Sequence, residues 1–134
     1  MKTDIRHKQD IETLVQYFYE QVRADAQLAP FFDHVNWDAH LPVMYDFWEN
    51  TLFYTGSYGG NPMKIHDRLH QMKELSAADF DQWLHLFTAS VDLLFQGERA
   101  TLAKQRATSI ATVMRIKILH TNPIPATPKK NDPQ

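Results

Sequence analysis

Residues 76–95, SAADFDQWLHLFTASVDLLF, decide the class of fold. The first four of them form a capping-box pattern, with Asp79 in the place that glutamate usually takes. Apolar side chains then recur at helical spacing, at Phe80, Trp83, Leu84, Phe87, Val91, Leu94 and Phe95. We expect Gly97 to end this helix. It is the most apolar segment of the chain, so it is expected to run through the middle of an all-helical protein.

Three further segments on either side of this helix also have helical patterns. Residues 8–25 alternate apolar and charged side chains with the spacing of an amphipathic helix, and residues 38–54 do so on two faces. Pro42 predicts an irregular first turn in the second of these. Pro30 interrupts the apolar residues 28–33, which predicts a turn or a short helix. The last helix is expected over residues 98–119, with Leu102, Ala103, Ala107, Ile110, Val113, Met114 and Ile116 buried.

The connections between helices have their own signals. Residues 55–60, TGSYGG, contain three glycines and predict a loop. Asn61 and Pro62 then supply an N-cap and a first-turn proline, so a short helix is expected as far as about Lys73. Four prolines fall between residues 123 and 134. We therefore expect one folded domain over residues 1–120 and a disordered, proline-rich tail over residues 121–134.

Composition excludes several classes of function. The chain has 134 residues, a net charge of -2 and 22% charged residues, which gives no footprint for nucleic acid or an anionic membrane. It has no cysteine, which excludes disulfides, thiolate zinc sites, iron–sulfur clusters and cysteine nucleophiles. No apolar run approaches the roughly 20 residues of a membrane span, so a cytoplasmic protein is expected. Phosphate loops, zinc-protease motifs, nucleophile elbows and calcium loops are also missing.

The remaining chemistry lies in histidines and ring donors on the inward faces of the expected helices. His66 and His70 are on the short helix, His40 on the helix before it, Tyr19 on the first helix and Trp83 on the central one. Each has an ordinary interpretation as a core aromatic or a solvated imidazole. His66 and His70 could also bind zinc from one helix face, but no third ligand stands out. A helical interaction or regulatory module without a cofactor therefore remains an alternative.

The ordered segments resemble the truncated haemoglobins, most closely their third group. The matching stretches are FYEQVRAD (18–25), LAPFF (28–32), WDAHLPVMYDFW (37–48), GNPMKIH (60–66), FDQWLHLF (80–87) and AKQRATSIATVM (103–114). They follow the family's order and cover most of residues 8–118. The resemblance implies a truncated globin fold, in which two helix pairs cross over a haem in a 2-over-2 arrangement. Residues 1–120 would then be the globin domain.

The resemblance also assigns roles to individual residues. His66 matches the proximal histidine that binds iron, and Tyr19, Trp83 and His40 match the distal residues that face the gas ligand. The expected haem-contact set is Phe18, Tyr19, Phe32, His40, Met44, Phe47, His66 and Trp83. One spacing departs from the family, because His66 lies 17 positions before Trp83 whereas His70 lies 13 before it. The GNPMKIH pattern favours His66, since insertions collect between helices.

The function implied is that of a haem b protein that binds O2, NO or CO. Tyr19 and Trp83 are hydrogen-bond donors able to stabilise the negative charge that develops on O2, and His40 is expected to act as a gate. Two neutral hydrogen bonds, each of about 1 kcal/mol, would slow O2 release. Slow release suits redox chemistry better than bulk transport, so NO dioxygenase or peroxidase-like detoxification with an external electron donor is expected. The protein is expected to be a monomer or a weak homodimer.

Overall fold

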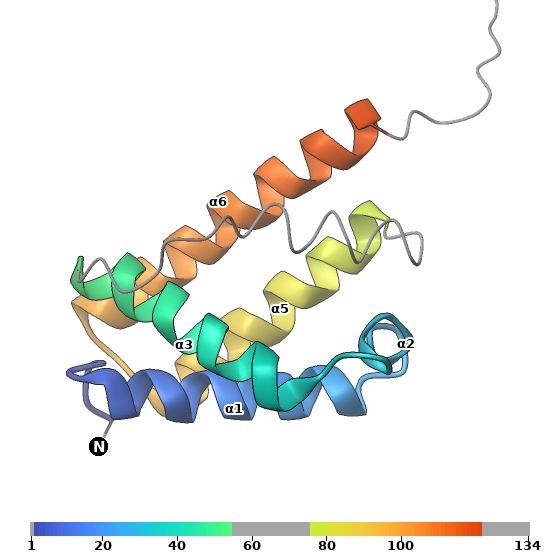
Figure 1. The fold of residues 1–134 in the computed structure, drawn as a ribbon. Helices are drawn as coiled ribbons and strands as arrows, with labels where there is room; N and C mark the ends of the chain where they lie inside the picture. The colour runs from blue at the N-terminus through green and yellow to red at the C-terminus, as the bar shows by residue number, and fades with distance from the viewer. Residues whose placement is uncertain (1, 55–75, 122–134) are drawn as a thin grey trace, which may run out of the picture.

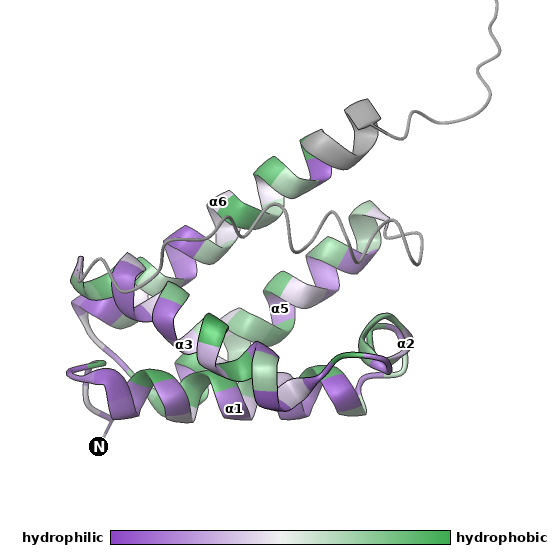
Figure 2. Cartoon of the chain, viewed as in Figure 1, coloured by the Kyte–Doolittle hydropathy of each residue, from purple (hydrophilic) through white to green (hydrophobic). Residues whose placement is uncertain are grey.

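The computed structural model describes residues 2–54 and 76–121, and in this part of the chain all the regular structure is helical (Figure 1). The helices are α1 (Lys8–Ala24), α2 (Ala29–Phe32), α3 (Trp37–Phe53), α5 (Ala77–Leu94) and α6 (Glu98–Thr121). α1 packs against α3, α5 packs against α6, and the two pairs meet through contacts of α1 with α5 and of α3 with α6. This is the predicted 2-over-2 arrangement of an all-helical fold. Hydrophobic residues gather where α1, α3 and α5 cross (Figure 2).

The capping box predicted at the start of α5 is present. Ser76 Oγ accepts a hydrogen bond from the backbone N–H of Asp79 at 3.3 Å, and the Asp79 carboxylate accepts one from the backbone N–H of Ser76 at 2.8 Å. The two bonds satisfy N–H groups that a helix start leaves without intrahelical partners. α5 ends at Leu94, before the expected Gly97, and Phe95 is its extended C-cap.

Phe87 of α5 is at the centre of an aromatic core. Its ring stacks on Trp48 of α3 at 4.7 Å between centroids and on Trp83 of α5 at 5.8 Å. The edge of Phe18 from α1 meets it at 5.1 Å and an interplanar angle of 81°. Stacked and edge-on aromatic pairs add about 0.5–1.5 kcal/mol each beyond the area that they bury. These contacts fix α1 and α3 against α5.

α3 differs in two ways from the helix expected over residues 38–54. It tolerates Pro42 inside its second turn, although an irregular first turn was expected, and Asn36 caps its start by accepting from Ala39 N at 3.4 Å. Its buried residues form one stripe, Met44, Trp48 and Leu52, each four positions after the last. A spacing of four is close to one helical turn, so these residues share one face of α3. The helix contacts α1 and α6, and Trp48 also reaches Phe87 of α5.

The expected buried face of α6 is partly wrong. Its buried residues are Ala100, Ala103, Ala107, Ala111 and Met114, whereas Val113 and Ile116 are 44% and 52% exposed. The buried positions follow a helical repeat of three and four, and Val113 and Ile116 lie off that stripe. The side facing α5 is mostly alanine, which allows two helix backbones to approach closely. Four of the five buried positions of α6 are alanine, so small side chains line most of its packed face.

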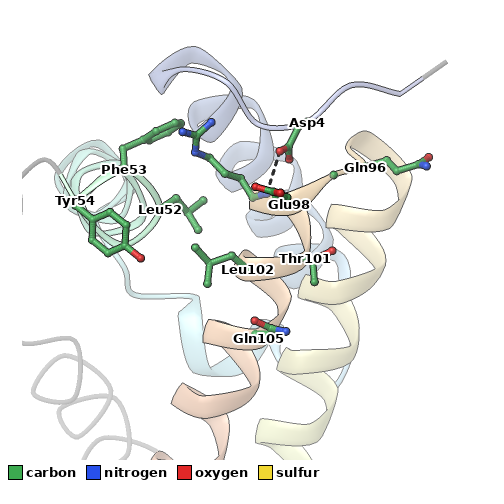
Figure 3. A pocket seen from close by; sticks show the side chains of 11 residues that line it. Asp4, Leu52, Phe53, Tyr54, Gln96, Glu98, Thr101, Leu102 and Gln105 are labelled. Carbon is green, nitrogen blue, oxygen red and sulfur yellow. Dashed lines mark hydrogen bonds between the residues drawn. The ribbon is translucent and has the colours of Figure 1, made fainter.

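An N-terminal segment closes the turn between α5 and α6. The carboxylate of Asp4 accepts hydrogen bonds from the backbone N–H groups of Arg99 and Ala100 at 2.9 and 2.8 Å, so it caps α6 from a distant part of the chain (Figure 3). Gly97 has a φ of 145°, and a Cβ there would lie 2.5 Å from Asp4 Cγ. Only glycine suits this position, because both its backbone angle and its space exclude a side chain.

Several predictions fall outside the described residues. They are the glycine loop and short helix of residues 55–75, which include His66 and His70, and the tail of residues 122–134. In the described part, no helix has the length and apolar character needed to cross a membrane.

Candidate functional site

Three helices bring polar and aromatic side chains together at one end of the α1–α3 crossing. Tyr19 of α1 is only 5% exposed. Its ring meets the edge of the His40 imidazole from α3 at 5.3 Å between centroids, and the ring of Phe32 from α2 at 6.1 Å. Pro30 lies in the first turn of α2, and Phe32 at the end of this short helix is buried. The sequence-predicted residues Tyr19, Phe32 and His40 therefore form one cluster.

Burial determines the protonation state of Tyr19. Removal from water penalises the phenolate, so the pKa of the Tyr19 hydroxyl is raised well above its ordinary value. The hydroxyl is therefore protonated near neutral pH. A protonated phenol withdrawn from water can donate a hydrogen bond to a ligand that carries partial negative charge.

Burial acts on His40 in the opposite direction. Desolvation disfavours the imidazolium, so the pKa of His40 is lowered and the ring is neutral near pH 7. Its Nε2 atom is buried and has no hydrogen-bond partner among the residues that the structure describes. A buried polar atom without a partner costs roughly 1–3 kcal/mol. An arrangement of this kind is typical of a side chain that completes its hydrogen bonding with a bound molecule.

Phe18 connects this cluster to Trp83. Its ring contacts Tyr19 at 4.8 Å and meets Trp83 of α5 edge-on at 5.7 Å and 89°. Phe18 is fixed because it is almost completely buried and also touches Phe87. Tyr19 and Trp83 thus both contact the ring of Phe18.

The other predicted haem contacts lie further along α3. Met44 is one turn after His40 and buried, and Phe47 is partly buried with its ring edge-on to Trp48 at 5.2 Å. At spacings of four and three positions, His40, Met44 and Phe47 lie along the same side of α3. The predicted metal ligand His66 and its alternative His70 lie outside the described residues.

Two long-range side-chain hydrogen bonds, which the sequence did not reveal, form beside Trp83. Gln27 Nε2 donates to Asp79 Oδ1 at 2.8 Å, and Gln82 Nε2 donates to Asp25 Oδ1 at 2.8 Å. Together they tie the turn before α2 to the first turns of α5, next to Trp83. Partners more than 50 positions apart leave no local sequence signal.

Trp37 is a second feature that the sequence analysis missed. Its ring contacts both Tyr19 and His40, at 5.1 and 5.4 Å between centroids. It lies three positions before His40 on α3, and residues at this spacing are neighbours on a helix surface. That spacing could have predicted the contact between Trp37 and His40.

A separate cavity of about 840 Å³ opens at the far end of α3, beside the start of α6. Leu52 and Leu102 point toward each other across it (Figure 3). None of its described lining residues belongs to the cluster around Tyr19. Within residues 2–54 and 76–121 no group of three or more histidines and carboxylates is placed to hold a metal ion.

Two crossed helix pairs, with a buried tyrosine and a half-buried histidine meeting at one end, are the architecture of a shortened globin. A profile of the bacterial-like globin family matches residues 4–119, and the chain belongs to this family. It is 31% identical over 118 residues to the group 3 truncated hemoglobin ctb of Campylobacter jejuni, covering 84% of this chain and 91% of that protein. The protein is a truncated haemoglobin most like the third group.

Solved structures support the same conclusion. The crystal structure of the group III truncated hemoglobin from Campylobacter jejuni superposes with a TM-score of 0.77 at 30% identity, over 87% of this chain and 94% of that one. The structure of Chlamydomonas reinhardtii THB1 gives a TM-score of 0.64 at 24% identity, over 80% of this chain and 88% of that one, and shows the fold alone. Membership of the globin family implies that the chain binds haem and a small ligand.

Proposed function

We propose that this protein holds haem b through His66 and binds O2, NO or CO in the pocket formed by Tyr19, His40 and Trp83. When bound, the haem would be held by the His66 imidazole and would supply an iron able to bind a diatomic gas. The chain supplies everything else in the pocket. Phe18, Phe32, Met44 and Phe47 are assigned to the apolar contacts with the porphyrin.

The observation that carries this proposal is the pairing of Tyr19 and His40. Both side chains are neutral, and both are partly or fully withdrawn from water. Tyr19 offers a hydroxyl proton, while the buried Nε2 of His40 lacks a partner among the described residues. A cofactor-free core would be expected to pair or avoid such an atom, because its desolvation is unfavourable. A pocket built for a small polar ligand accounts for it.

The nature of these groups favours redox chemistry over bulk transport. Preorganised donors in a water-poor site stabilise charge that develops on a ligand, and they do so more strongly than the same groups would in water. A ligand held in this way leaves slowly. We therefore assign the protein to NO or peroxide detoxification, with NO dioxygenase or peroxidase-like turnover sustained by an external electron donor.

A hemin titration of the apoprotein tests the haem assignment. We expect stoichiometric uptake, an intense Soret band, and shifts of this band on reduction and on addition of CO. A protein that stays colourless would support the cofactor-free module, and one that binds zinc but no hemin would support the alternative site at His66 and His70.

Two variants test the identity of the proximal ligand. His66→Gly is expected to lose tight haem retention, and added imidazole should restore it by occupying the vacated position. His70→Ala is the matched control and should retain haem as the wild type does. The reverse pattern, loss in His70→Ala alone, would assign the iron to His70.

A further inference from the structure

Trp37, the first residue of α3, forms the outer layer of the ring cluster around Tyr19. On its inner side it touches three rings on three different helices. The edge of its ring meets His40 at 5.4 Å and 81°, and it is tilted against Tyr19 at 5.1 Å and 56°. It stacks on Phe32 at 6.1 Å and 25°. Such a ring can move only if several contacts are broken together.

On its outer side Trp37 is covered by a cation. The guanidinium of Arg23, in the last turn of α1, lies 5.1 Å from the centre of the indole ring. Arg23 is exposed to solvent, and Trp37 is only partly exposed. The order from solvent inward is therefore Arg23, Trp37 and then the pair His40 and Tyr19.

We propose that Trp37, held in place by Arg23, is the positioning residue that keeps the His40 imidazole turned inward against Tyr19 and so limits the entry of ligands. The effect on His40 belongs to the apoprotein as well. The effect on ligand entry rests on the haem function proposed above.

The physical argument concerns the freedom of His40. A half-buried histidine on a helix surface can leave its pocket by rotating about χ1 toward water. Here the imidazole meets the Trp37 ring at 5.4 Å and 81° and the Tyr19 ring at 5.3 Å and 79°. These two rings are themselves 5.1 Å apart, so together they form one packed aromatic surface against which the imidazole lies. Removing the indole would take away part of that surface and raise the population in which His40 points outward. Ligand entry through that opening would then become faster.

Arg23 contributes less than Trp37. A cation over an aromatic face at an exposed site shifts an equilibrium by roughly two- to fivefold, and salt weakens it. The aromatic contacts of Trp37 correspond to about two- to twelvefold for each ring pair. Loss of Trp37 should therefore have the larger effect.

The first test uses the apoprotein and needs no haem. The His40 pKa is measured by NMR of the imidazole resonances in the wild type, Trp37→Leu and Trp37→Phe. Burial holds this pKa below its ordinary value of 6.5 in the wild type. In Trp37→Leu, as His40 enters water, we expect it to rise toward 6.5, while Trp37→Phe, which keeps an aromatic ring, should stay near the wild type. Equal titration of all three folded proteins would overturn the proposal.

The second test uses the haem-loaded protein and measures CO association after flash photolysis. Trp37→Leu should bind CO faster by about two- to twelvefold, and Arg23→Ala by about two- to fivefold. Arg106→Ala removes an exposed arginine from α6 and is the matched control, with no change expected. If Trp37→Leu fails to fold, Arg23→Ala still decides the outcome. A CO association rate equal to that of the wild type would refute the proposal that Arg23 holds Trp37 against His40. Failure to take up hemin would instead refute the haem function and leave the first test intact.

Discussion

Tyr19→Phe isolates the contribution of one hydroxyl to ligand binding. The Tyr19 ring contacts Phe18, Phe32, Trp37 and His40, all at centroid distances between 4.8 and 6.1 Å. Phenylalanine can fill the same space and keep these four contacts. The substitution therefore removes a donor without opening a cavity, and the fold should be unchanged.

The size of the effect follows from the burial of that hydroxyl. A neutral hydrogen bond stabilises its acceptor by about 0.5–1.5 kcal/mol net, which corresponds to a roughly two- to twelvefold faster dissociation of O2. The hydroxyl is fully protonated because burial raises its pKa, so the effect should not change between pH 6 and 9. CO should respond less, because it carries little charge on its outer atom.

The assay is stopped-flow displacement of O2 by CO. Tyr17→Phe is the matched control, since Tyr17 lies two positions earlier on α1 and is only partly buried, outside the Tyr19 cluster. We expect Tyr17→Phe to release O2 at the wild-type rate. If Tyr19→Phe does the same, the hydroxyl does not stabilise the ligand, and the case for slow release and detoxification loses its physical basis.

Four other predictions concern Trp83, the Asp4 cap of α6, Gly97 and the tail. Trp83→Phe should also speed O2 release, and its combination with Tyr19→Phe should be non-additive because the remaining donor can reorient. Asp4→Ala removes the cap of α6 and should lower the unfolding free energy by roughly 0.5–2 kcal/mol, measured by urea denaturation. Burial disfavours the charged Asp4 carboxylate, but hydrogen bonds from backbone N–H groups outweigh this and lower its pKa. The difference in unfolding free energy between Asp4→Ala and the wild type should therefore shrink as the pH falls below about 3.8, where the carboxylate becomes protonated. Gly97→Ala places a Cβ against the Asp4 side chain at a positive φ and should destabilise the protein by roughly 1–3 kcal/mol in the same assay. An unchanged denaturation midpoint would mean that Asp4 moves away without cost. Removal of residues 122–134 should leave the thermal midpoint nearly unchanged, because a polar, proline-rich segment has little apolar surface to bury, and a large drop would show that the tail packs.

Most of the helices could be predicted from short-range patterns in the sequence. The capping box of α5 spans Ser76 to Asp79, so both partners lie within one helical turn and the motif is visible in four letters. The buried faces of α1 and α5 follow from helical periodicity for the same reason. Helical spacing placed Tyr19, His40 and Trp83 on inward faces and so made them candidates, but only the family resemblance assigned them roles.

Only the tertiary structure decided which distant residues meet. Asp4 caps α6 across 95 positions, and Gln27 reaches Asp79 across 52, so neither pair leaves a local pattern. The same holds for the exposure of Val113, since an apolar residue on α6 is buried only if a neighbouring helix covers it. The cation–π contact of Arg23 with Trp37 joins the end of α1 to the start of α3. Such contacts depend on how the helices cross, and helix crossing is set by side-chain packing across the whole core, which no local segment of sequence encodes.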